Sequence, residues 1–218
     1  MVDYIPILAR GTLETLYMTV MSTLFSYLFG LPLGVWVYIT QKGNLRPNRG
    51  LNMVLSWIVN IGRSIPFIIL IVAIIPFTRL IVGTAIGPTA AIVPLIVAAI
   101  PFVARMVESS LEELDRGVIE AAKAMGASDL QIILHVCLPE AVPSIIRGVS
   151  ITAITLVGYS AMAGAVGGRG LGDIAIRYGY QRYQGDVMWI TVVLLVIIVA
   201  MIQFAFNTLA RVIDKRNK

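Results

Sequence analysis

The side chains that could carry chemistry gather in one polar interval, residues 105–147. It holds eleven of the 29 Lys, Arg, Asp and Glu residues, together with the single histidine, His135, and the single cysteine, Cys137. Residues at i and i+2 of a helix do not face one another, so these two form a poor nucleophile pair. One histidine excludes a His-Glu-x-x-His zinc site, and the absence of any Gly-Lys pair excludes a phosphate-binding P-loop. We therefore predict a chain that is not an enzyme and that carries no cofactor or metal.

A glycine-rich run at residues 164–172 is the other stretch that could bind a ligand. It does not match the Gly-x-Gly-x-x-Gly pattern of dinucleotide sites, and it follows a long apolar segment rather than a strand. The run instead predicts a flexible turn, followed by a short surface segment with aromatic side chains at residues 171–183.

The overall composition is that of an integral membrane protein. Of the 218 residues, 58% are hydrophobic and only 13% are charged, and the mean hydropathy is +0.87. A soluble domain has about 25% charged residues, and it could not cover this much apolar surface. The net charge of +5 then indicates contact with anionic lipid rather than with nucleic acid. Residues 1–10 have no basic stretch before an apolar one, so we expect no cleavable signal peptide.

Five intervals are long and apolar enough to cross a bilayer, which takes about 20 residues. We therefore predict an all-α fold with five transmembrane helices, near residues 12–40, 52–78, 88–108, 144–166 and 187–211. The second interval contains Arg63, which can reach the membrane surface from one or two turns inside. Pro66, one turn further on, is expected to kink this helix.

The charged residues between these intervals predict the orientation. Alternate loops carry eleven Lys and Arg on one side of the membrane and five on the other, with Arg63 left out. The richer side is expected to be cytoplasmic. The N-terminus is then outside, and the C-terminus and the polar interval are in the cytoplasm. The eleven include Lys215, Arg216 and Lys218, beyond the last predicted helix.

The third and fourth predicted helices are rich in Gly, Ala, Ser, Thr and Pro. Small residues allow close helix packing, and proline frees carbonyl groups that can line a cavity, so packing and a transport pathway both remain open. No other ionisable residue lies deep in a predicted helix. A self-sufficient carrier or channel usually needs such residues, and an intramembrane enzyme would need a Ser-His, Asp-Asp or metal set inside the bilayer, so both alternatives are disfavoured.

The polar interval itself predicts two short amphipathic helices. From Arg116, the apolar positions recur at i, i+3, i+4 and i+7, which marks one face of a helix; they are Val118, Ala121, Ala122 and Met125. Gly126 is expected to end this helix and Ser128 to cap the next, which Pro139 should end. Spacing alone does not separate docking on another protein from folding back on this one.

The order Glu120-Ala121-Ala122, Gly126 and Leu138-Pro139 resembles the EAA loop of bacterial ABC importer permeases, with Val136 at a usual Ile position. The resemblance covers about residues 12–212 and implies a type I permease fold in one domain, 1–218. It implies a cytoplasmic coupling loop at 109–143 that docks on a separate ATPase. Carried over by position, the contacts would be Glu120, Ala121, Ala122 and Gly126, with Pro139 returning the chain to the membrane.

Longer strings resemble the methionine importer permeases of the D-methionine class. Examples are residues 63–70, RSIPFIIL, and residues 155–162, TLVGYSAM. This resemblance implies a homodimer in the bacterial inner membrane, two ATP-binding subunits that carry ATP and Mg²⁺, and an external methionine-binding lipoprotein. A permease for another small amino acid is the alternative. Tyr159, Ser160 and Met162 are our candidates for pathway residues.

Overall fold

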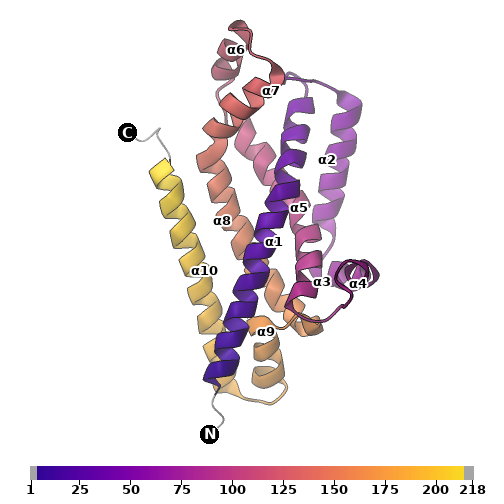
Figure 1. The fold of residues 1–218 in the computed structure, drawn as a ribbon, viewed down its shortest axis with the longest axis vertical. Coiled ribbons are helices and arrows are strands. Elements are labelled where there is room, and N and C mark those ends of the chain that lie inside the picture. Colours follow the sequence, from indigo (N-terminus) through magenta and orange to yellow (C-terminus); the bar gives the residue numbers. More distant parts are fainter. Residues whose placement is uncertain (1–3, 214–218) are drawn as a thin grey trace.

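The computed structural model describes residues 4–213, and in that range every regular element is a helix (Figure 1). Four helices run along the length of the molecule: α1 (Ile5–Thr40), α5 (Pro88–Glu112), α8 (Leu138–Ala163) and α10 (Gly185–Ile213). α8 is the main part of a longer helical stretch, Asp129–Gly168. Each of these four stretches is long and apolar enough to cross a membrane. Residues 1–3, Lys215, Arg216 and Lys218 lie outside the described range.

The second predicted span is broken. α2 (Arg49–Ser64) and α3 (Phe67–Ala73) form a pair bent by 98°, so there are five spans only if this pair counts as one. The break follows from Pro66, which disfavours a helical backbone at the residue before it. Ile65 is extended, with φ −78° and ψ 122°. The expected kink is confirmed, and α4 (Ile75–Val82) then follows as a separate short helix.

The interior of the bundle lies between α1, α5 and α8. α1 approaches α5 closely enough that a Cβ placed on Gly34 would lie 2.5 Å from the carbonyl oxygen of Ala104. Elsewhere along these two helices, Met18 and Leu95 belong to one core cluster and are fully buried. Small side chains therefore bring these two helices together, as expected for packing inside a membrane. α10 instead exposes most of its large aliphatic side chains, as expected of a helix that faces lipid.

The segment after α8 is folded against the bundle. A π-helical turn (Gly164–Gly168) leads into α9 (Gly170–Ile174) and a second π-helical turn (Ala175–Tyr180). Leu171 and Ile174 are 0% and 4% exposed and pack with Leu8 of α1. The expectation of a surface segment at residues 171–183 is therefore wrong for its first part. Leucine and isoleucine one turn apart gave α9 an apolar face to bury.

The two ends of the molecule differ in character. The first residues of α1 lie beside α9 at one end, whereas α6 (Arg116–Ala124), α7 (Asp129–Ile132) and the last turn of α10 lie toward the other (Figure 1). The polar interval that the sequence singled out therefore projects from one end of the bundle.

Candidate functional site

The polar interval begins with α6, whose two ends are fixed by local hydrogen bonds. The side chain of Asp115 accepts a hydrogen bond from the backbone N–H of Gly117 at 2.8 Å and caps the first turn. At the other end, Gly126 adopts a left-handed conformation with φ +82°. Its N–H donates to Lys123, and the N–H of Ala127 donates to Ala122, which is the Schellman pattern. Gly126 ends the helix as predicted.

The second short helix, α7, has the cap that the sequence predicted. The Ser128 side chain accepts from the N–H of Gln131, and the Gln131 side chain accepts from the N–H of Ser128 at 2.8 Å. This reciprocal capping box satisfies two backbone donors that the helix start leaves unpaired. Arg46, between α1 and α2, pairs with Asp129 at 2.7 Å and ties this helix to the same end of the bundle.

Pro139 does not end the second helix, contrary to the sequence-based prediction. The chain continues from α7 through a π-helical turn (Ile133–Cys137) directly into α8. The N–H of Leu138 donates to the carbonyl of Ile133, five residues back. A proline ring in an α-helix clashes with the carbonyl four residues earlier, and the wider π-turn removes this conflict. Pro139 therefore lies within a continuous helix, at the start of α8.

α6 shows two faces with different surroundings. Ala122, only 4% exposed, and Ile119 pack against the core at this end of the bundle. Val118, Ala121 and Met125 lie on the adjoining face and are exposed, Met125 to 82%. A helix that only folded back would bury this second apolar face as well. α6 is thus held by one face and leaves another exposed.

Of the four predicted contact residues, three are exposed and one is buried. Glu120, Ala121 and Gly126 are exposed on α6 and its terminal turn. Ala122 faces inward, so its role is to seat the helix. Pro139 is exposed on the helix that returns to the bundle.

The three predicted pathway residues on α8 have different environments. Met162 is 48% exposed. The ring of Tyr159 stacks on Phe67 of α3 with 4.6 Å between the ring centroids, which links α8 to the broken span. Ser160 is 1% exposed, and its hydroxyl donates to the carbonyl of Val157. Of the three, Met162 has the side chain most open to a space outside this chain.

Sequence reasoning missed the other residues on the face of α8 that carries Met162. Ile151, Thr155 and Gly158 precede Met162 at intervals of four, three and four residues, so all four share one side of the helix. Ile151 is 50% exposed, and Gly158 has open space where a Cβ would stand. Counting back from Met162 at helical spacing would have found them.

Sequence reasoning also missed a polar network where α1, α2 and α5 meet. Glu108 is 3% exposed and accepts hydrogen bonds from Arg105 at 2.5 Å and from Gln41 at 2.8 Å. Arg105 also donates to Asn60 of α2 at 2.8 Å. Both charges lie on α5, which runs on to Glu112, beyond the predicted end at residue 108. Nothing in the sequence pointed to this network, because Gln41 is 67 residues away from Glu108 along the chain.

Metal binding finds no support in the part of the chain that the structure describes. Within residues 4–213, no group of three or more His, Cys, Asp and Glu side chains could hold a metal ion. The structure shows an exposed face on α6 at one end of the bundle and a second exposed face on α8.

Known proteins resemble this chain over nearly its whole length. A probable D-methionine transport system permease protein (MetI) of Vibrio cholerae is 54% identical over 210 residues, covering 96% of this chain and 93% of that protein. A methionine import system permease protein (MetP) of Bacillus subtilis is 47% identical, covering 95% of this chain and 93% of its own.

Solved structures also resemble this chain over nearly its whole length. A chain of the methionine ABC transporter MetNI, in an inward-facing conformation, superposes with a TM-score of 0.97 at 53% identity, covering 99% of this chain and 100% of its own. A more distant amino acid ABC transporter shares the fold, with a TM-score of 0.73 at 19% identity over 99% of both chains. The model of the family described as binding-protein-dependent transport system inner membrane component matches residues 30–218. The chain belongs to this family of ABC importer permeases.

Proposed function

We propose that this chain is the transmembrane permease of an ATP-driven importer of methionine. The observation that carries the coupling to ATP is the exposed face of α6, which has apolar and charged residues but no partner surface within the described chain. The substrate is inferred from relatives that are named as methionine permeases and are 47% to 54% identical. Permeases for another small amino acid are the alternative.

Two copies of the chain form the translocation unit, and each carries one ATP-binding subunit on its α6. ATP and Mg²⁺ bind to those subunits. The end that bears α6 faces the cytoplasm, as the excess of Lys and Arg around it indicates. The opposite end, with the start of α1 and α9, receives methionine from an external binding lipoprotein.

The permease contributes a mechanical element with two arrangements rather than a reactive group. Closure of the two ATPases moves α6, and the continuous helix from Asp129 to Ala163 carries this movement into the membrane without a break at Pro139. The face of α8 with Ile151, Thr155, Gly158 and Met162 then lines the pathway. The Met162 side chain is flexible and apolar. Two copies of it can close the outer end of the pathway without offering the substrate a polar group to bind.

Uptake into proteoliposomes tests this function. The permease is reconstituted with its ATPase and binding protein, and radiolabelled methionine is counted inside with ATP, without ATP and with a non-hydrolysable analogue. We expect accumulation only with ATP. Accumulation of another amino acid in its place would shift the substrate assignment, and uptake by the permease alone would contradict the dependence on a partner ATPase.

The role of α6 is tested with a matched pair of carboxylate variants. Glu120→Gln removes a charge from the exposed side of α6, and Asp186→Asn removes one from the exposed first turn of α10 at the other end. We expect Glu120→Gln to lower ATP-driven uptake severalfold while Asp186→Asn leaves it unchanged. Equal behaviour of the two variants would count against docking at Glu120.

A further inference from the structure

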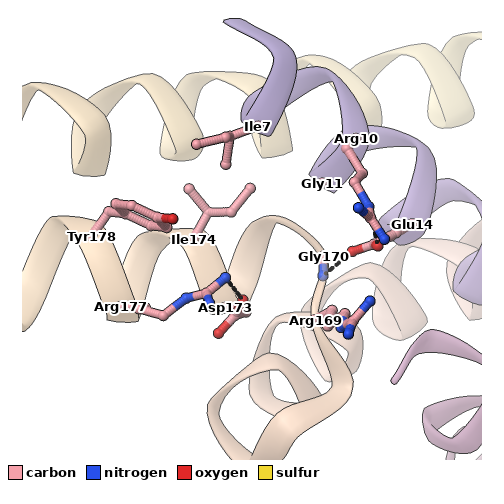
Figure 2. A pocket seen from close by; sticks show the side chains of 10 residues that line it. All are labelled: Ile7, Arg10, Gly11, Glu14, Arg169, Gly170, Asp173, Ile174, Arg177 and Tyr178. Atoms are coloured by element: carbon pink, nitrogen blue, oxygen red, sulfur yellow. Dashed lines mark hydrogen bonds and ion pairs between the residues drawn. The ribbon is translucent and has the colours of Figure 1, made fainter. Parts of the chain in front are cut away.

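A cavity of about 330 Å³ lies at the end of the molecule opposite α6, between the first turns of α1 and the segment around α9 (Figure 2). This volume is at the lower limit of small-ligand sites. Its lining is mixed: Ile7, Ile174 and Tyr178 are apolar or aromatic, whereas five charged side chains come from α1 and from the segment 169–177.

Four of these five charges neutralise one another. On α1, Arg10 pairs with Glu14 at 3.0 Å, and on α9 and the turn after it, Arg177 pairs with Asp173 at 2.6 Å. Both pairs are drawn as dashed contacts in Figure 2. Glu14 has a second partner, because its other carboxylate oxygen accepts a hydrogen bond from the backbone N–H of Gly170 at 3.1 Å.

Arg169 is the fifth charge, and within residues 4–213 it has neither an ion pair nor a side-chain hydrogen bond. Its backbone is unusual, with φ 62° and ψ −155°, a region that is essentially reserved for glycine. Three of its near neighbours, Gly167, Gly168 and Gly170, are glycines, yet the position that needs glycine most carries arginine. An exposed side chain recovers none of this strain by burial, which points to a function for the guanidinium group.

The loop that holds Arg169 is fixed rather than adaptable. Besides the bond from Gly170 to Glu14, the N–H of Leu171 donates to the hydroxyl of Thr15 at 2.9 Å. Both bonds tie the loop to α1, and Leu171 is fully buried beneath it. The cation is therefore presented from a rigid support at the rim of the cavity, which keeps the entropy cost of binding low.

We propose that this cavity binds a single carboxylate group on the guanidinium of Arg169. Three cations against two anions leave one positive charge, which matches a monoanion. Glu14 and Asp173 would repel a dianion such as phosphate, and the planar fork of arginine suits a carboxylate. The carboxylate comes either from a free amino acid or from an Asp or Glu side chain of the external binding protein. This inference rests on the proposed function for its side of the membrane.

The test uses the complete permease–ATPase complex in nanodiscs and three variants. Arg169→Gly removes the guanidinium and relieves the backbone, so a loss of binding cannot come from a destabilised fold. Arg169→Lys keeps the charge and should retain part of the binding. Arg79→Gln removes an exposed arginine of α4 that does not line the cavity and serves as the control.

Two arms identify the source of the carboxylate. One measures binding of methionine, with methioninamide as the probe that lacks the carboxylate; the other measures binding of the purified binding protein. We expect Arg169→Gly to weaken at least one of these by about tenfold, as for loss of a charge-assisted hydrogen bond. The measurement that changes identifies the source of the carboxylate, either the free amino acid or the binding protein. The proposal is overturned if neither arm changes, or if Arg79→Gln has the same effect. ATP-driven uptake by the unaltered complex tests the proposed function separately.

Discussion

Replacing Gly126 by alanine should uncouple ATP hydrolysis from transport. Gly126 ends α6 in a left-handed conformation, and a Cβ placed there has no heavy atom within 4 Å, so the substitution acts on the backbone alone. A left-handed residue other than glycine costs about 1–2 kcal/mol. If the turn at position 126 leaves the left-handed conformation in the undocked permease, docking on the ATPase must restore it. The cost then lowers the docked population by a factor of about 5–30.

Gly83 provides a control with the same conformation. It ends α4 with φ +80°, it also has open space around its Cβ position, and it lies far from α6. Gly83→Ala should cost the same conformational energy without touching the ATPase.

Both variants are reconstituted with the ATPase and binding protein, and uptake, ATP hydrolysis and the thermal unfolding midpoint are measured. We expect similar small losses in the unfolding midpoint, with a severalfold loss of methionine imported per ATP only in Gly126→Ala. Unchanged coupling in Gly126→Ala, or an equal loss in Gly83→Ala, would refute the reasoning.

Three further predictions concern stability and are read from thermal or denaturant unfolding in detergent. Arg169→Gly should stabilise the protein by about 1 kcal/mol, because relief of 1–3 kcal/mol of strain exceeds the flexibility cost of glycine; a lower midpoint would contradict the strained backbone. Gly172→Ala should destabilise by about 1–3 kcal/mol, since its Cβ would lie 2.3 Å from the Ala161 carbonyl oxygen, while Gly185→Ala, in open space, should change little. Glu108→Ala should cost about 1–3 kcal/mol by removing the buried acceptor that Arg105 and Gln41 share. Glu112→Ala removes only an exposed acceptor of Gln41 and should cost under about 1 kcal/mol; similar losses would argue against the buried network.

Local signals in the sequence predicted much of the coupling segment. Gly126 and Ser128 mark a helix end and a helix start by their own backbone chemistry, so both were predictable without tertiary contacts. Pro66 likewise predicted a break in the second span. Pro139 misled because its usual effect, ending a helix, was cancelled by the π-helical turn at Ile133–Cys137, and no residue type specifies such a turn.

Features that depend on distant partners were not predictable. Periodicity placed Ala122 with Val118 and Met125 on one face, but only the packed bundle separates the buried Ala122 from its exposed neighbours. The burial of Glu108 needs Gln41 from another helix. The conformation of Arg169 depends on hydrogen bonds that the next two residues, Gly170 and Leu171, donate to side chains of α1, more than 150 positions away in sequence.

Docking of α6 on an ATPase subunit is tested most directly by site-specific cross-linking. Cys137, the single cysteine, is replaced by alanine, and Ala121→Cys then carries a thiol-attached photo-cross-linker on the exposed face of α6. Tyr180→Cys, at an exposed residue of the opposite end, is the control. We predict that position 121 cross-links to the ATPase, identified by mass spectrometry, and that position 180 does not. A complex that still imports methionine but gives no ATPase cross-link from position 121 would contradict docking through α6.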